Sequence, residues 1–151
     1  MHKMIDMSKS LFLLIAPNSN EGIKFFEMIK QNKDKLDDKD KITDSDLETI
    51  NSNKELITEY FIKSLKIEER EKIIKFLHKY KKDYDESSYN LAIKNLLNYK
   101  YNVLIRQSIK SMVKKMLKQL KDRLILELND YLEYNTDKNQ EFLKLIEGLY
   151  E

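Results

Sequence analysis

The sequence predicts an all-α fold, specifically a single-domain helical bundle of about five to six helices. The chain has only two glycines and one proline, fewer than the turns of an all-β or doubly wound α/β fold require. Apolar residues also recur at helical spacing, and one segment continues this pattern over far more turns than the others. Because 151 residues fit one domain of ordinary size, we expect residues 1–151 to form a single helical domain.

The first apolar segment, Leu11–Ala16, is halted by Pro17 and predicts a core helix or a short buried strand. It is shorter than the apolar region of a signal peptide, and Asp6 stands where such a peptide is basic. No stretch approaches the roughly 20 apolar residues of a membrane-spanning helix. The chain also has no cysteine, which is consistent with a reducing compartment. We therefore expect an intracellular protein, in the cytoplasm or in a host cytosol.

A second helix is expected from the polar residues Asn18, Ser19 and Asn20, which offer a cap, to about Asn32. Apolar residues recur within it at helical spacing and predict a face that turns to the core. This face consists of Ile23, Phe26 (or Phe25), Met28 and Ile29.

Residues at about 33–52 are the most polar part of the chain and predict a loop or linker, with at most one helical turn through Leu47 and Ile50. A calcium-binding loop is the alternative, since acidic residues occupy positions 1, 3, 5 and 12 of a twelve-residue pattern. These residues are Asp44, Asp46, Glu48 and Glu55. Position 6 is Thr49, however, where the sharp turn requires glycine. A solvated loop is therefore favoured, and no metal site is predicted.

Two helices with a short connection follow at about residues 53–65 and 67–82, and we expect them to pair as an antiparallel hairpin. Glutamates near the start of the second helix and lysines near its end match the helix dipole. The segment Asp83–Ser88 then provides a capping turn for the next helix.

The longest predicted helix, at about residues 87–134, has one apolar and one basic face. Its apolar face includes Tyr101, Ile105, Ile109, Met112, Val113, Met116, Leu120 and Leu124. No carboxylate occurs from Ser87 to Lys121, whereas the segments 34–71 and 122–151 are both acidic. The opposite face carries a basic stripe, which consists of Lys100, Arg106, Lys110, Lys114, Lys118 and Lys121. A final helix is expected after Thr136, with Phe142, Leu145, Ile146, Leu149 and Tyr150 folded back on the bundle.

The sequence carries no pattern of a known chemistry. His2 and His78 are its only histidines, and Glu71, seven residues before His78, stands at a spacing that can orient an imidazole. Glycine-rich phosphate loops, zinc-binding helix patterns and the Glu-x-x-His pairs of carboxylate-bridged metal bundles are all absent from the sequence. We therefore predict no catalytic residue and no cofactor.

The favoured interpretation is a non-enzymatic protein-interaction module, a small subunit or adaptor of a larger assembly. Nine tyrosines and six methionines supply the residue types that protein interfaces favour. The alternative is a nucleic-acid-binding accessory protein, in which the basic stripe neutralises phosphates. A third interpretation makes the basic stripe only the solvated face of a lysine-rich helix. The sequence leaves the oligomeric state and the identity of any partner open.

Overall fold

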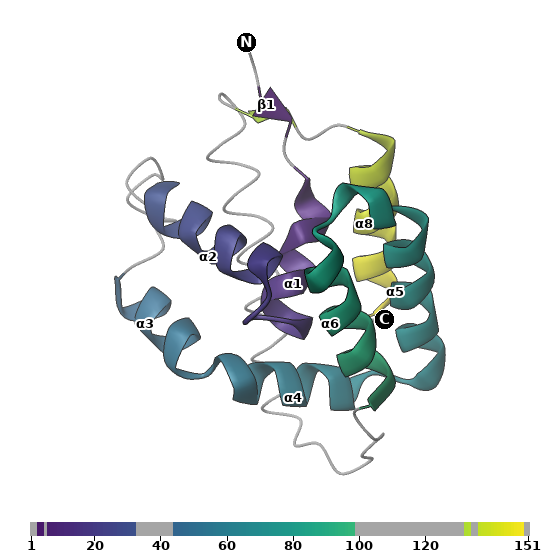
Figure 1. Cartoon of the computed structure of the whole chain (residues 1–151), viewed down its shortest axis with the longest axis horizontal. Coiled ribbons are helices and arrows are strands. Elements are labelled where there is room, and N and C mark those ends of the chain that lie inside the picture. The colour runs from purple at the N-terminus through teal and green to yellow at the C-terminus, as the bar shows by residue number, and fades with distance from the viewer. Residues whose placement is uncertain (1–2, 5, 33–43, 99–131, 134–135, 150–151) are drawn as a thin grey trace.

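The computed structural model describes residues 3–4, 6–32, 44–98, 132–133 and 136–149, and in this part the predicted all-α class is confirmed. Figure 1 shows the arrangement of the helices. The elements are β1 (Lys3–Met4), η1 (Met7–Lys9), α1 (Ser10–Ile15), α2 (Asn20–Asn32), α3 (Asp44–Ser52), α4 (Lys54–Ser64), α5 (Ile67–Lys79), η3 (Lys81–Asp83), α6 (Glu86–Asn98), β2 (Leu132–Glu133) and α8 (Asp137–Gly148). The organisation of the whole chain as one domain stays a prediction.

Helix α1 lies at the centre of the molecule, and all six of its residues are buried. The apolar side chains from Leu11 to Ile15 are each at most 2% exposed. A helix that is apolar around its whole circumference requires cover on every side, and α2, α4 and α6 all contact α1 (Figure 1). The segment before Pro17 is therefore a core helix, and the alternative of a buried strand is excluded.

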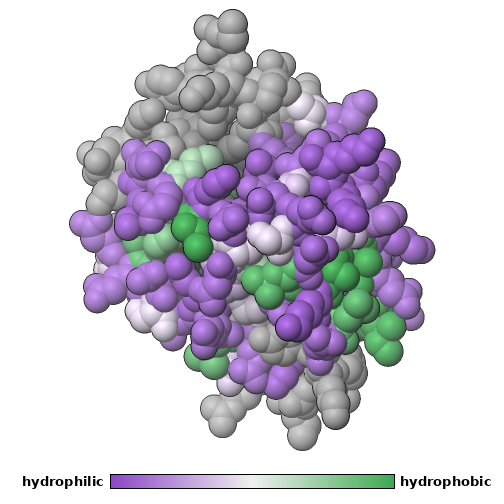
Figure 2. Space-filling view, viewed as in Figure 1, coloured by the Kyte–Doolittle hydropathy of each residue, from purple (hydrophilic) through white to green (hydrophobic). Residues whose placement is uncertain are grey.

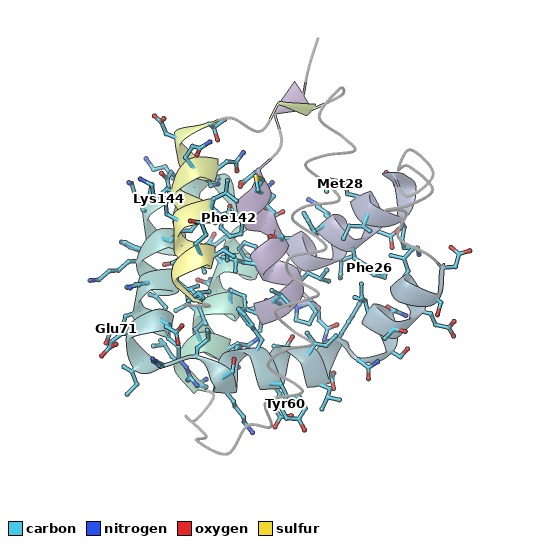
Figure 3. All side chains as sticks on the ribbon, turned by 180° about the vertical axis from the view of Figure 1, so that it is seen from behind. Phe26, Met28, Tyr60, Glu71, Phe142 and Lys144 are labelled. Carbon is cyan, nitrogen blue, oxygen red and sulfur yellow. The ribbon has the colours of Figure 1, made fainter. Side chains whose placement is uncertain are left out.

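The main core extends from α1 to the C-terminal half of the described chain. Phe12 packs against Tyr84 with ring centroids 5.0 Å apart, and Phe76 of α5 packs against Phe142 of α8 at 6.0 Å. Figure 3 shows Phe142 directed from α8 toward the interior. The last helix thus closes the core, as its apolar spacing predicts.

A smaller apolar cluster lies beside the main core and joins α1, α2 and α3. It consists of Leu13, Phe25, Phe26, Ile29, Leu47 and Ile50. Helix α3 contributes only Leu47 and Ile50 to it, so two side chains carry the apolar attachment of this helix. The cluster places α2 and α3 beside each other, with one open side that is described below.

Side-chain caps start three of the helices at the predicted places. The Ser19 hydroxyl accepts the backbone N–H of Gly22 at 3.1 Å, the Asp85 carboxylate accepts that of Ser88 at 3.2 Å, and the Thr136 hydroxyl accepts that of Asn139 at 3.1 Å. Each bond satisfies a donor that the first helical turn leaves unpaired. The first cap also needs glycine, because a Cβ at position 22 would lie 2.6 Å from the Ala16 carbonyl oxygen at the end of α1.

The predicted loop at about 33–52 is helical in its second half, because α3 spans Asp44–Ser52. Leu47 and Ile50 are buried, and this burial stabilises a helix that its polar composition did not predict. A helix that begins at Asp44 also excludes the calcium-loop alternative, because that loop must turn sharply at Thr49. Residues 33–43 lie outside the described residues.

The prediction of one long helix at about 87–134 is wrong at its C-terminal end. Its beginning is confirmed, since α6 starts at Glu86 and is described as far as Asn98. Leu132–Glu133, however, is extended and pairs in parallel with Lys3–Met4. The spacing of apolar residues carries no information about backbone pairing between segments this far apart in the sequence. Residues 99–131 lie outside the described residues.

The two helices predicted as an antiparallel hairpin, α4 and α5, are inclined steeply to each other. Figure 1 and Figure 3 both show α4 crossing the base of the molecule, whereas α5 rises along its side. The connecting residues Leu65 and Lys66 are extended, and the Glu69 carboxylate accepts the Lys66 backbone N–H at 2.8 Å. Leu65 is buried, which fixes the turn, so α5 packs beside α6 and α8 instead.

None of the helices in the described ranges has the length and apolar character needed to cross a membrane.

Truncation of the α1 core should cost a large part of the stability of a domain of this size. Phe12→Ala removes a ring that is 0% exposed, and we expect it to lower the free energy of unfolding by about 3–5 kcal/mol. Leu97→Ala, at a side chain 67% exposed, should cost less than about 0.5 kcal/mol. Urea denaturation followed by circular dichroism measures both, and equal losses would show that α1 is not the core.

Candidate functional site: a groove between α2 and α3

The basic stripe predicted from the sequence cannot be placed against the rest of the fold. Its six residues, Lys100, Arg106, Lys110, Lys114, Lys118 and Lys121, all lie outside the described residues. Its role toward nucleic acid or an acidic partner therefore stays a prediction. Two other kinds of site are considered below for the described residues, a catalytic cluster and a groove at the surface.

Histidine chemistry has little support in the described geometry. His78 is exposed, and its Nδ1 lies 3.2 Å from the Tyr89 hydroxyl of α6. Glu71, which the sequence offered as a partner, is two turns away on the same helix, at a rise of roughly 10 Å. Across the described ranges, no group of three or more histidine, aspartate or glutamate residues could hold a metal ion.

A buried polar cluster surrounds Tyr84. The Ser8 hydroxyl donates to Asp6 Oδ1 at 2.5 Å and shares a 2.7 Å hydrogen bond with the Tyr84 hydroxyl. Burial raises the pKa of Tyr84 well above its ordinary value, because the phenolate would lose its hydration. The cluster contains a hydroxyl and a carboxylate, but Ser8 is 0% exposed. A substrate therefore has no access to the hydroxyl.

The same cluster fastens the N-terminal segment to α8. The Lys138 ammonium lies 2.5 Å from Asp6 Oδ2 and 3.0 Å from Asp83 Oδ2. Beside it, the Met7 backbone N–H donates to Asn139 Oδ1 at 2.9 Å. The bonds of Lys138 to Asp6 and of Met7 to Asn139 each join residues 132 positions apart in the sequence, so the cluster has a structural role.

A second titratable cluster joins α5 to α8 at the surface. The Tyr80 hydroxyl donates to Glu141 Oε2 at 2.5 Å, and the Lys79 ammonium lies 3.0 Å from the same oxygen. The hydrogen bond from Tyr80 and then that from Lys79 lower the pKa of Glu141 below its ordinary 4.5. Both hydrogen bonds favour the ionised carboxylate, so the cluster stabilises the contact between the two helices.

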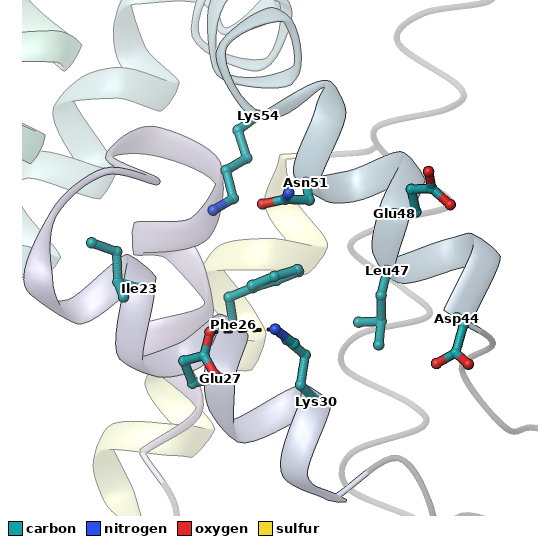
Figure 4. A pocket seen from close by; sticks show the side chains of 9 residues that line it. All are labelled: Ile23, Phe26, Glu27, Lys30, Asp44, Leu47, Glu48, Asn51 and Lys54. Carbon is teal, nitrogen blue, oxygen red and sulfur yellow. Dashed lines mark ion pairs between the residues drawn. The ribbon is translucent and has the colours of Figure 1, made fainter.

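A groove lies on the open side of the small apolar cluster (Figure 4). Its volume is about 440 Å³, within the range of ligand sites in proteins. Each wall is one face of a helix, because the lining residues follow the spacing i, i+3, i+4, i+7. Helix α2 contributes Ile23, Phe26, Glu27 and Lys30, and α3 contributes Asp44, Leu47, Glu48 and Asn51, with Lys54 from the start of α4.

The floor of the groove is apolar, whereas its rim is charged. Phe26 and Leu47 are 6% exposed and form the floor, and Ile23 is 45% exposed at one end. The Phe26 ring lies close to two ammonium groups, that of Lys54 at 4.7 Å and that of Lys30 at 5.7 Å from its centroid. Such cation–π contacts hold the lysine stems along the apolar floor.

The charges of the rim differ in whether they already have a partner. Lys30 lies 3.7 Å from Glu27 of the same helix, and Figure 4 marks this ion pair. Lys54 has no carboxylate partner among the described residues, and the exposed carboxylate of Glu48 has no cationic partner there either. One cation and one anion on the rim are therefore available to a ligand.

A more polar hollow adjoins the groove at the junction of α3 and α4. Its volume is about 530 Å³, and Asn51 and Lys54 line both spaces. The exposed apolar side chain there is Leu56. Figure 2 shows apolar side chains at the surface over α2 and, separately, over the lower parts of α5 and α6, where Ile67 and Leu97 are the exposed apolar residues.

Sequence reasoning missed the groove for two reasons. It assigned residues 44–52 to a loop, which removes one wall, and it placed Ile23 on the core face of α2. The spacing of Leu47 and Ile50 was the available indication of a helical wall, and the pair Phe25–Phe26 left open which side of α2 is buried. Both phenylalanines are buried, and Ile23 is left at the surface.

The groove has the chemistry of a binding site. Its lining includes apolar groups, carboxylates, ammonium groups and one amide, but no histidine, serine, threonine or tyrosine. These groups can bury an apolar side chain of a ligand and form ion pairs with its charged groups.

Compared with protein-family models, with curated proteins and with solved structures, the chain gives no match.

The Tyr80–Glu141 contact predicts a measurable pH dependence. Because the pKa of Glu141 is lowered in the folded chain, its contribution to stability is present above pH 4.5 and is lost as the pH falls through the lower folded pKa. Tyr80→Phe removes the first donor and should raise the pKa of Glu141 toward 4.5. Carboxyl-carbon NMR titration measures it, with Tyr60→Phe on α4 as the control. An unchanged Glu141 pKa in Tyr80→Phe would contradict the assignment.

Proposed function

We propose that the chain is a non-enzymatic protein-interaction module that receives a segment of a partner protein in the α2–α3 groove. The single observation that carries this proposal is the pairing of two helical faces around an apolar floor with a charged rim. An apolar centre surrounded by polar and charged groups is the usual organisation of a protein interface. A small subunit or adaptor of a larger assembly fits this role.

The attachment of α3 supports a binding role for its exposed face. Its buried side fixes it to α2 through Leu47 and Ile50, while Glu48 and Asn51 of the same helix line the groove. On the opposite wall, Ile23 exposes 45% of its surface next to the buried Phe26. A side chain from a partner can therefore gain apolar contact at Ile23 without any rearrangement of the core.

The test compares the same substitution inside and outside the groove. Ile23→Glu places a carboxylate at the apolar end of the groove, and it should reduce capture of the native partner by about tenfold or more, as for an interface anchor. Ile67→Glu introduces the same change at an exposed isoleucine of α5 and should leave capture unchanged. Affinity capture from cells that express the protein, quantified by mass spectrometry, measures the difference.

Circular dichroism confirms that both variants are folded before capture is compared. A partner that is retained equally by wild type, Ile23→Glu and Ile67→Glu would place its contact elsewhere and overturn the proposal. Absence of any specifically captured protein would overturn it as well.

The alternative proposal, a nucleic-acid-binding accessory protein, rests on the basic stripe of the sequence, which lies in a segment without carboxylates from Ser87 to Lys121. If the stripe binds phosphates, affinity for duplex or single-stranded nucleic acid should fall steeply with salt. Reversal of Lys110, Lys114 and Lys118 to glutamate should abolish binding for every sequence. Fluorescence anisotropy with a labelled oligonucleotide measures this, and a salt-independent signal would exclude phosphate neutralisation.

A further inference from the structure

We infer that the groove selects an amphipathic helix that carries one acidic and one basic residue about two turns apart on its apolar face. This inference rests on the proposed function, and it specifies the chemistry of the partner segment. It follows from the order of charges along the rim, from the spacing of the lining residues on the two walls, and from two rim charges that have no partner of opposite charge among the described residues.

The sign of the rim charge changes along the groove. Asp44 and Glu48 lie toward the start of α3, whereas Lys54 lies at the start of α4, near Ile23. Figure 4 shows Glu48 and Asp44 at one end and Lys54 with Ile23 at the other. A ligand that lies along the groove therefore meets an anionic end and a cationic end, with the apolar floor between them.

The two rim charges that can form ion pairs with a ligand are those of Glu48 and Lys54. Glu48 is exposed, and no cation of the described residues pairs with it, whereas Lys30 is already paired with Glu27 at 3.7 Å. Lys54 contacts the Phe26 ring at 4.7 Å and has no carboxylate partner within the described ranges. A carboxylate brought to Lys54 and a cation brought to Glu48 would thus complete pairs that the described chain leaves open.

The walls indicate a helix as the occupant. Both are helical faces with the spacing i, i+3, i+4, i+7, and no strand edge lines the groove to offer backbone hydrogen bonds to an extended peptide. A helix in a groove presents its anchors at the same spacing. Along α3 the lining residues run from Asp44 to Asn51, which are seven residues apart, on the order of 10 Å at the helical rise of 1.5 Å per residue. Charges at i and i+7 of a partner helix match this distance, with apolar anchors at i+3 and i+4 between them.

Opposite charges on the rim also reject other ligands. A helix with two lysines at i and i+7 meets Lys54 with a like charge, and a helix with two glutamates meets Glu48 in the same way. Such like-charge contacts are a common source of specificity at interfaces. The inference therefore concerns a preference among helices of equal apolar content, and this preference can be measured without knowledge of the native partner.

The probes are three synthetic helical peptides of about 18 residues, a length at which a helix can form in water. All carry leucine at i+3 and i+4, and they differ only at i and i+7, where they carry Glu and Lys, Lys and Lys, or Glu and Glu. Binding is measured at low salt by amide chemical-shift changes in the isotope-labelled full chain. We expect shifts at α2 and α3, with the mixed-charge peptide binding about two- to fivefold tighter than the other two, as exposed ion pairs allow.

Charge reversal in the groove should redirect this preference. Lys54→Glu makes both ends anionic, so this variant should prefer the peptide with two lysines, whereas Glu48→Lys should prefer the peptide with two glutamates. Lys54→Gln, which only removes the charge, should abolish the discrimination between the mixed-charge and the two-lysine peptides. Lys24→Gln, on α2 but outside the groove lining, is the control and should keep the preference of the wild type.

Equal binding of the three peptides, or shifts that fall outside α2 and α3, would overturn the inference. Its failure is distinguishable from failure of the proposed function. If Ile23→Glu abolishes partner capture while the peptides show no charge preference, the groove binds a partner by other chemistry. If the peptides follow the expected order while capture is independent of Ile23, the groove has this selectivity but is not the native docking site.

Discussion

The burial of α1 on all sides is the constraint on which the rest of the described structure depends. A helix of six residues has little stability of its own, so it forms only because other elements cover its whole circumference. α2, α4 and α6 provide this cover, and each must turn an apolar face inward to do so. Burial also requires a hydrogen-bond partner for the polar side chain of α1. The Ser10 hydroxyl has one, because it donates to the Met7 carbonyl at 2.7 Å.

The groove is exposed because α2 buries some of its apolar residues and leaves Ile23 at the surface. Phe25 and Ile29 join Leu13 of α1 in the small apolar cluster, and Phe26 completes it from the side that α3 covers. Helix α3 is too short and too polar to cover this side fully, so Ile23 stays at the surface. The same geometry that completes the small cluster therefore leaves an apolar floor with a charged rim, and no separate element is needed to build the groove.

The sequence predicted those elements whose stability is local in origin. The Ser19 and Thr136 caps and the acidic start of α5 depend on neighbours within a few residues, and all are found where they were expected. The pairing of Lys3–Met4 with Leu132–Glu133 depends on segments at opposite ends of the chain, and spacing carries no information about it. Helix α3 was missed because only two of its nine residues are apolar. Those two stabilise a helix only through their contact with α2, which local sequence does not reveal. One wall of the groove was missed for the same reason.

The charges of the groove also assign the two proposed functions to different parts of the sequence. Carboxylates of Glu27, Asp44 and Glu48 line the groove, and they would repel the phosphates of a nucleic acid. Phosphate neutralisation needs a row of cations with few acids nearby, and the sequence offers this only between Ser87 and Lys121. A polyanion and an amphipathic helix would therefore select different parts of the chain. Groove substitutions would therefore weaken binding of the helix alone, and charge reversal in the basic stripe would weaken binding of nucleic acid alone. The two effects are independent because a polyanion requires cations with few acids nearby, whereas the amphipathic helix requires charges of both signs.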